Sequence, residues 1–335
     1  MTDLSTQYLG LTLRSPIVAS SSPVTGDPEG LRALDAAGVG AVVLPSLFEE
    51  QVEREAVEVD RMLATGAEAS GEAAGYFPEL DTYNTGPDRY LAQVVEAKAN
   101  LSVPVIASLN ATTSGGWVRY GRLLADAGAD AVELNANLVA TDPTLTGTDV
   151  EAALLTMVTD VLDAVDVPVA VKLGPFWSSL SHLATRLSEA GVAGLVLFNR
   201  PFAPDLELDR LEVVPHLTLS EPDDLFLSLR WIGLLEGRVN ADLAATSGVH
   251  DAAGVAKALL AGADVAMMAS ALLRHGPGHV ATVLADLRAW MAEREYASVD
   301  QLRGSVSARG VADPAAYVRA NYLEALTSYS STFPV

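Results

Sequence analysis

The segment Leu260–Met268 reads LAGADVAMM, and three other segments of the chain repeat its pattern. In each copy a helix-like stretch ends on Ala-Gly or a similar pair, and an apolar run follows at once. The other copies are Ala36–Leu44 (AAGVGAVVL), Asp126–Leu134 (DAGADAVEL) and Glu189–Leu197 (EAGVAGLVL). Glycine suits the left-handed residue that closes a helix, and a continuous apolar run is typical of a parallel strand buried on both faces. Each copy therefore predicts a helix end followed by a buried strand.

A second apolar strand is predicted upstream of each copy. These strands are Pro16–Ser20, Pro104–Leu109, Pro168–Leu173 and Val239–Thr246. Between the strands, apolar residues at three- and four-residue spacing predict helices, as at Tyr120–Ala127 and Leu180–Ala190. Four β-α-β units give eight parallel strands, and this alternation is typical of a closed barrel. We therefore predict an α/β protein with a single (β/α)8 TIM barrel that forms one domain over residues 1–335.

Two long connections interrupt the rhythm of the repeats. One runs from about Phe48 to Arg89 after the second barrel strand, and the other from about Arg200 to Asp224 after the sixth. Both follow the carboxyl ends of strands, where the active sites of such barrels lie, so we expect them to serve the site. The tail, Ser298–Val335, is predicted to form one or two helices outside the barrel.

The composition excludes several classes of function. The formal net charge of -22 opposes binding to nucleic acid. The chain has no cysteine, which excludes disulfides, thiol nucleophiles and Fe–S clusters held by this chain. No apolar run reaches the ~18 residues of a membrane span, and the N-terminus does not resemble a signal peptide. We expect a cytoplasmic protein without a membrane partner.

The histidines give no indication of a metal site. They are His182, His216, His250, His275 and His279. None of them falls into the spacing that zinc-binding motifs require. We therefore assign no metal.

Polar residues stand at the carboxyl ends of three predicted strands. Asn110, Asn135 and Asn199 each follow an apolar run. An amide offers both a donor and an acceptor, which suits the mixed edge of a flavin or a pyrimidine. The alternative is that each asparagine only forms a turn.

Lys172 interrupts the apolar strand VAVKL. A lysine in such a strand is costly unless it is paired, so we expect an anion or an electron-rich cofactor beside it. Next to a flavin, the ammonium would stabilise the negative charge that develops on reduction. The alternative is a structural lysine that pairs with a carboxylate of a neighbouring strand, such as Glu133.

Small residues surround the ends of the first, seventh and eighth strands. Ala19 and Ser20 would let a flat ligand approach the backbone closely. The turns that contain Thr246, Ser247 and Gly248, and Ala269 with Ser270, lead into predicted helices. The loops after strands 7 and 8 form the recurrent phosphate site of this fold. The alternative is that small residues only allow tight packing.

Taken in order, these strand ends resemble the dihydroorotate dehydrogenase family, nearer its soluble class 1 type. The resemblance spans roughly Leu9 to Leu273 and rests on PIVASSSP, NTGPDRYL, PVIASLN, AVELN, VPVAVKL, LVLFN and ATSGV with GADVAMMASAL. It implies FMN as cofactor and a small-molecule substrate. The residues that it assigns to the cofactor are Ala19, Ser20, Ser46, Asn110, Asn135, Lys172, Asn199, Thr246, Ser247, Gly248, Ala269 and Ser270.

The resemblance implies two glycines that this chain lacks. They would stand at Ser247 and Ala269. Backbone N–H groups can still bind phosphate there, provided that φ stays negative at both positions.

The substrate half of the site departs further from the family. The family's lysine after strand 2 is replaced by Pro45, its catalytic Cys or Ser by Leu138, and a substrate asparagine by Ala140. A second substrate asparagine is missing near Phe77 and Pro78. Oxidation of dihydroorotate needs a base, and leucine cannot act as one, so the catalytic residue stays unassigned. Candidate replacements on loops above the barrel are Tyr76, Tyr83, Thr112 and Asp142.

Three functions remain open from the sequence. The first is an FMN-dependent oxidoreductase that acts on a CH–CH or C=C bond, near a carbonyl, of a small substrate other than dihydroorotate. The second is a true dihydroorotate dehydrogenase of pyrimidine metabolism with a rearranged base. The third is a non-catalytic flavin-binding or partner-binding scaffold. The resemblance also implies a homodimer, and an Fe–S electron route would need a partner subunit because this chain has no cysteine.

Overall fold

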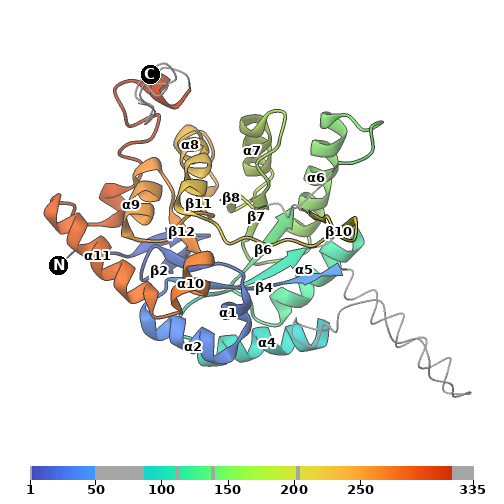
Figure 1. Ribbon diagram of the computed structural model, residues 1–335, viewed down its shortest axis with the longest axis horizontal. Coiled ribbons are helices and arrows are strands. Elements are labelled where there is room, and N and C mark those ends of the chain that lie inside the picture. The colour runs from blue at the N-terminus through green and yellow to red at the C-terminus, as the bar shows by residue number, and fades with distance from the viewer. Residues whose placement is uncertain (1, 50–86, 111–113, 137–139, 201–203, 319–335) are drawn as a thin grey trace, which may run out of the picture.

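The computed structural model describes residues 2–49, 87–110, 114–136, 140–200 and 204–318, in which eight parallel strands close into a barrel (Figure 1). These strands are β3 (Ile17–Ala19), β4 (Ala41–Phe48), β5 (Val105–Asn110), β6 (Ala131–Ala136), β7 (Val169–Leu173), β8 (Gly194–Leu197), β11 (Asp242–Ala245) and β12 (Val265–Met268). Their order around the barrel is β11-β12-β3-β4-β5-β6-β7-β8. The predicted (β/α)8 barrel is therefore confirmed.

Helices surround the barrel and connect its strands (Figure 1). They are α1 (Pro23–Gly26), α2 (Pro28–Ala37), α4 (Pro87–Asn100), α5 (Ser114–Asp126), α6 (Gly147–Leu162), α7 (Leu180–Glu189), α8 (Leu225–Leu235), α9 (Ala252–Ala261), α10 (Ser270–His275) and α11 (His279–Glu293). The glycines of the repeats have φ 96° at Gly38, 95° at Gly128, 102° at Gly191 and 119° at Gly262. The repeats thus place a left-handed glycine between helix and strand, as predicted.

Two small antiparallel hairpins were not predicted from the sequence. The first joins β1 (Thr6–Tyr8) to β2 (Leu11–Leu13), and its Tyr8 and Leu9 pack against the side chains inside the barrel. The backbone N–H of Leu9 donates a hydrogen bond of 2.7 Å to Asp242, at the amino end of β11. This hairpin therefore closes the amino-terminal end of the barrel and leaves the carboxyl end for a site.

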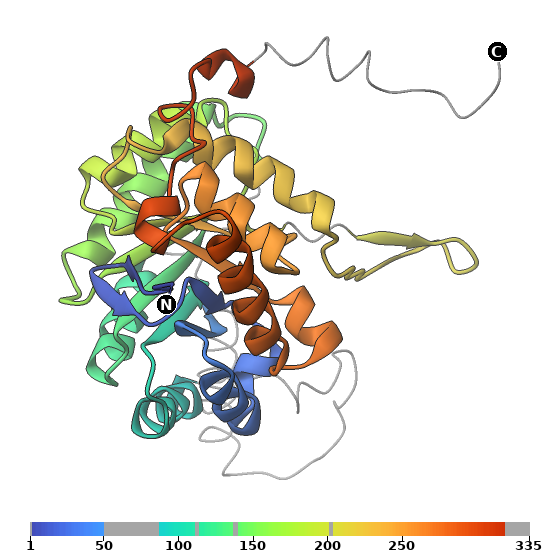
Figure 2. The same ribbon diagram turned by 90° about the vertical axis from the view of Figure 1, so that its left-hand side faces the viewer.

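The second hairpin lies in the long connection after β8. It joins β9 (Asp205–Glu207) to β10 (Glu212–Val214), and Figure 2 shows it projecting away from the barrel. A 3-10 turn, η1 (Pro222–Asp224), then leads into α8. Part of the long connection after β8 is therefore a hairpin followed by a 3-10 turn.

The described part of the tail, which ends at residue 318, forms short helical turns, and the rest of the predicted helical extension lies outside the described residues. Beyond α11 the described residues form α12 (Val299–Leu302) and the 3-10 turn η2 (Pro314–Tyr317), each of a single turn. Arg303, directly after α12, forms an ion pair with Asp264 at the start of β12. A charged contact therefore fixes the start of the tail to the barrel.

Pro45 disturbs the pairing of β4 with β5. The register of the two strands shifts between Val43 and Ser46, and proline cannot donate a ladder hydrogen bond. Ser46 then pairs with Ser108, and their hydroxyl oxygens lie 2.8 Å apart. Pro45, which stands where the resemblance implies a lysine, thus changes the local register of the strand.

Among the described residues, none of the helices combines the length and the apolar character that crossing a bilayer requires.

Asp264 makes the stability of this end of the barrel depend on pH. Burial raises the pKa of its carboxyl from 3.8 to about 6, although the Leu243 N–H and Arg303 favour the charged form. Because the folded pKa lies above the unfolded one, the stabilising contribution is complete below pH 3.8 and is lost as pH rises through about 6.

We predict that Asp264→Asn loses this pH dependence. The free energy of unfolding of the wild type, relative to the variant, should fall by roughly 2–3 kcal/mol between pH 4 and pH 7. Urea unfolding of both proteins at several pH values measures this difference. A difference that stays constant across the range would contradict the assignment.

Candidate active site

A cavity of about 560 Å³ opens above the carboxyl ends of the barrel strands. Its walls come from the loops after β3, β8, β11 and β12 and from the segment His216–Ser220, which crosses from the β9–β10 hairpin. Eight of the predicted site residues line it, namely Ser20, Lys172, Asn199, Thr246, Ser247, Gly248, Ala269 and Ser270. The structure therefore brings most of the predicted residues to one place.

The other four predicted residues lie beside or below this cavity. Ala19 is fully buried in β3, and Ser46 is held by its hydrogen bond to Ser108. Asn110 ends β5 and is partly buried. Asn135 pairs in register with Lys172, and its side-chain oxygen is buried without a hydrogen-bond partner among the described residues. Of the four, Asn135 thus retains an unused acceptor next to a residue of the cavity.

Lys172 fits both interpretations of the sequence, a lysine beside a cofactor and a structural lysine that pairs with Glu133. Its side chain reaches the cavity, and its Nζ atom also lies 3.8 Å from Oε1 of Glu133 on the neighbouring strand β6. Burial raises the pKa of Glu133, and the charge of Lys172 opposes that rise. The ammonium therefore lies between a buried carboxylate and the open cavity.

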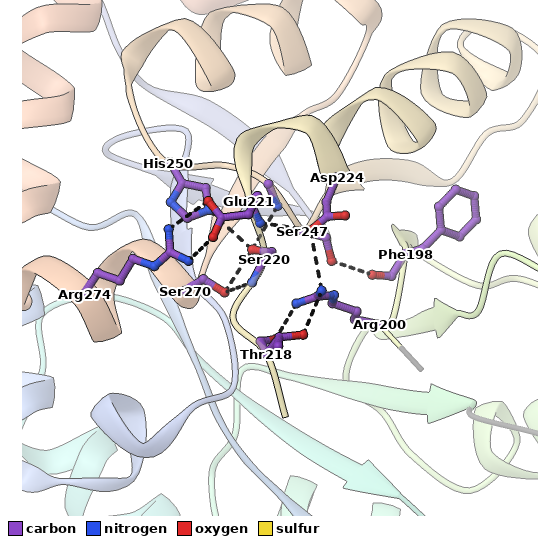
Figure 3. A network of polar contacts seen from close by, with 11 residues as sticks. Phe198, Arg200, Thr218, Ser220, Glu221, Asp224, Ser247, His250, Ser270 and Arg274 are labelled. Atoms are coloured by element: carbon purple, nitrogen blue, oxygen red, sulfur yellow. Dashed lines mark hydrogen bonds and ion pairs between the residues drawn. The ribbon is translucent and has the colours of Figure 1, made fainter. Parts of the chain in front are cut away.

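Hydroxyl and N–H donors converge where the last two barrel loops meet. The backbone N–H of Gly248 donates to Oγ of Ser220 over 3.2 Å, and the Ser220 hydroxyl donates to Oγ of Ser270 over 2.9 Å (Figure 3). The backbone N–H of Ser220 also donates to Ser270, over 2.9 Å. The Gly248 N–H, which the sequence assigned to a phosphate, thus already donates to a hydroxyl oxygen, that of Ser220.

Ser220 is a site residue that the sequence did not reveal. It lies in the long connection after β8, where no periodic pattern marks individual residues. Its neighbours Thr218 and His216 also line the cavity, as does Arg200, whose guanidinium donates to the carbonyl and hydroxyl of Thr218. Only the fold brings this segment over the barrel.

The charged side chains that line the cavity are cationic. Among the described lining residues these are Lys172 and Arg200, with His216 as a further basic group and no carboxylate. Outside the lining, Arg274 pairs with Glu221, and a hydrogen bond from Arg274 lowers the pKa of that carboxyl. In a chain of net charge -22, the lining is a local exception that carries cationic side chains, although Arg200 also lies 3.7 Å from Asp224 and Lys172 lies 3.8 Å from Glu133.

Of the four candidate replacements for the missing base, only Asp142 lies among the described residues. Asp142 is exposed and does not line the cavity, and hydrogen bonds from the Thr144 hydroxyl and N–H lower the pKa of its carboxyl. Ala140 is exposed as well. Tyr76, Tyr83, Thr112, Leu138 and the pair Phe77–Pro78 lie outside the described residues. No catalytic acid or base is therefore assigned.

Ser247 corrects one expectation from the sequence. Its φ is +70°, and that of Gly248 is +74°, so the backbone there is left-handed at two successive residues. The condition that φ stays negative is met at Ala269, with φ -130°, but not at Ser247. Ser247 keeps the left-handed backbone that a glycine would adopt there. A residue with a side chain is sterically strained in this conformation.

We predict that Ser247→Gly stabilises the protein. Relief of the left-handed strain should exceed the added chain entropy of glycine and raise the free energy of unfolding by about 0.5–1 kcal/mol. Ala269→Gly is the matched control and should lower stability, because Ala269 has no such strain. Urea unfolding at constant m-value measures both changes. Equal effects of the two substitutions would contradict the account.

No family model matches the chain, but comparison with curated proteins finds relatives over most of its length. The chain is 26% identical to "Dihydroorotate dehydrogenase B (NAD(+)), catalytic subunit" of Desulforudis audaxviator, over 90% of this chain and 96% of that protein. It is 27% identical to the protein of the same name from Cutibacterium acnes, over 91% and 99% of the two chains. It is 25% identical to "Dihydroorotate dehydrogenase A (fumarate)" of Lactiplantibacillus plantarum, over 89% and 97%.

These matches cover nearly the whole length of each relative, so they include the barrel together with the loops that form the cavity. They bear out the resemblance seen in the ordered strand ends, at an identity that leaves room for the departures at Pro45 and Leu138. Over most of its length the chain is therefore similar to dihydroorotate dehydrogenases.

Proposed function

We propose that this protein is an FMN-dependent oxidoreductase that acts on a CH–CH or C=C bond of a small anionic substrate other than dihydroorotate. The observation that carries the proposal is the cavity at the carboxyl ends of the strands, with Lys172 in its lining and hydroxyl and N–H donors around Ser220. The names of the relatives support the reaction class. We propose further that the whole chain is one domain, organised around this site.

The residues of the cavity fit the chemical groups of FMN. A volume of about 560 Å³ lies within the usual range for ligand pockets. Asn135 does not line the cavity, but it is the register neighbour of Lys172, and its buried, unpaired oxygen would find a donor in the N–H group of a flavin ring. Gly248, Ser270 and Ser220 supply the N–H and hydroxyl groups that a phosphate accepts from, and Ser220 would either share or yield its present hydrogen bonds. The donor set therefore suits a flavin that carries a phosphate.

The roles of the chain's own groups follow from their charges and positions. Bound FMN would supply the electron acceptor for a hydride that leaves a CH–CH bond, or the donor for the reverse reaction. Lys172 would hold its ammonium where negative charge develops on reduction. Arg200 and His216, which also line the cavity, would orient an anionic substrate.

The second candidate is a true dihydroorotate dehydrogenase, and the names of the relatives favour it. Against it stand Leu138, where the resemblance implies the base, and Ala140, where it implies a substrate asparagine. The two candidates share the cofactor and differ in the substrate that reduces it.

The first prediction from this proposal concerns the cofactor. Purified protein, or protein mixed with FMN, should show absorption bands near ~370 and ~450 nm that dithionite bleaches. Lys172→Ala should weaken FMN binding, because the variant loses the charge next to the ring. A wild-type protein that stays colourless and takes up no FMN would contradict the proposal.

Anaerobic mixing with dihydroorotate then separates the candidates. Bleaching of the flavin within the time of a turnover supports the dihydroorotate dehydrogenase, whereas an unbleached flavin supports another substrate. A flavin that dithionite reduces but none of a panel of unsaturated or hydroxylated carboxylates affects would favour the non-catalytic scaffold.

We also propose a homodimer that forms through the β9–β10 hairpin. This hairpin exposes Leu206, Leu208, Leu211 and Val213, with 65%, 79%, 88% and 69% of their surface accessible. Contiguous apolar surface of this kind typically marks a protein interface. An electron-transfer subunit is a further proposed partner, since an Fe–S route cannot use cysteines of this chain.

Substitution of the hairpin tests the dimer. Leu211→Asp should shift the sedimentation coefficient from that of a dimer to that of a monomer at micromolar concentration. Val95→Asp on α4, which is also exposed, is the matched control and should leave the dimer intact. A wild-type protein that sediments as a monomer would contradict the proposal.

A further inference from the structure

A layer of polar side chains lies inside the barrel directly below the cavity. Successive side chains of a strand point to opposite faces, so β5 places Ser108 inside the barrel, β6 places Glu133 there and β7 places Lys172 there. Ser108 and Glu133 are register neighbours, and the exposed fractions of the three residues are 0%, 1% and 9%. Below this layer the described interior residues are mostly apolar, and the polar exceptions include the Tyr8 hydroxyl of the closing hairpin and Asp242, which accepts from the Leu9 N–H.

The carboxylate of Glu133 is unusual in this layer. Neither of its oxygens has a hydrogen-bond partner among the described residues. The neighbouring hydroxyl of Ser108 is engaged with Ser46 instead. A buried carboxylate without hydrogen bonds is strongly disfavoured unless a cation compensates its charge. In the described part of the chain, Lys172 is the cation within ion-pair range of Glu133, at 3.8 Å.

The described residues give Lys172 one charged partner. Glu133 lies on the barrel side and does not line the cavity, whereas the ammonium does. At this separation in a low-dielectric interior, the attraction between the charges is large and salt screens it little. Lys172 has many rotamers, and an opposite charge below the cavity restricts the positions that its ammonium can take.

We propose that Glu133 is a positioning residue that holds the Lys172 ammonium in the lining of the cavity and offsets part of its positive charge toward the flavin. The inference rests on the proposed function, because it assumes a flavin above Lys172. It assigns a role to a residue for which the reaction itself has no use. Removal of the carboxylate would leave the lysine charge unopposed, and the reduced flavin, which carries negative charge, would then gain stability.

Glu133→Gln tests this effect with a substitution of nearly equal shape. The midpoint potential of bound FMN, measured by equilibration with a reference dye, should shift to more positive values than in the wild type. The shift corresponds to an increase of about tenfold in the affinity for reduced relative to oxidised FMN. Glu133→Asp, which keeps the charge, should restore most of the wild-type potential.

Tyr8→Phe is the matched control. It removes another buried and unpartnered polar group from the barrel interior without changing its charge at neutral pH. The potential of this variant should equal that of the wild type. A potential in Glu133→Gln that also equals that of the wild type would show that Glu133 does not act on Lys172, and it would overturn the inference.

A cycle of variants measures the pairing without any flavin. Lys172→Gln leaves an uncompensated buried carboxylate, so its urea midpoint should fall, and Lys172→Gln/Glu133→Gln should recover part of the loss. This comparison also serves if Glu133→Gln alone does not fold. Additive effects of the two substitutions would show that the residues are not paired, and would overturn the inference.

The two hypotheses fail in distinguishable ways. A wild-type protein that takes up no FMN contradicts the proposed function, and the unfolding cycle then reports on the Lys172–Glu133 pair alone. A protein that takes up FMN, with an unchanged potential in Glu133→Gln, contradicts only the role of Glu133.

Discussion

Closure of the parallel sheet is the constraint on which the rest of this structure depends. When eight parallel strands close into a barrel, their carboxyl ends meet at one rim, and the loops that follow them meet there as well. Segments as distant in sequence as Ser20 and Ser270 thereby line one cavity. The β1–β2 hairpin closes the opposite end with Tyr8 and Leu9, so the interior opens only toward that rim among the described residues.

The polar layer at the rim is the second consequence of the same geometry. Because side chains alternate along each strand, a residue two positions from an apolar interior residue also points inward. Apolar residues such as Ile106 and Ala131 fill the lower barrel, and the next inward positions hold Ser108 and Glu133. The transition from apolar to polar interior occurs within one step of the strand. The buried polar groups therefore lie next to the cavity, where hydrogen bonds or charges of a ligand could compensate for their burial.

The repeats predicted the barrel well because their signals are local. Ala-Gly helix ends and continuous apolar strands depend on a few adjacent residues, and the left-handed glycines appear where expected. Ser220 could not be predicted in this way, since its hydrogen bonds to Gly248 and Ser270 join segments that only the fold brings together. The β9–β10 hairpin could not be predicted either, because each of its strands has three residues, too few for a periodic pattern. Ser247 shows a backbone conformation that its residue type does not suggest.

In the proposed function, the donors around Gly248, Ser220 and Ser270 hold the phosphate of a flavin whose ring lies near Lys172. Calorimetric titration of flavin-free protein with FMN and with riboflavin, which lacks the phosphate, tests this claim most directly. The account predicts that FMN binds and that riboflavin binds at least about tenfold more weakly, because it leaves those donors without an anion. Equal affinity for the two flavins, or no binding of either, would contradict it.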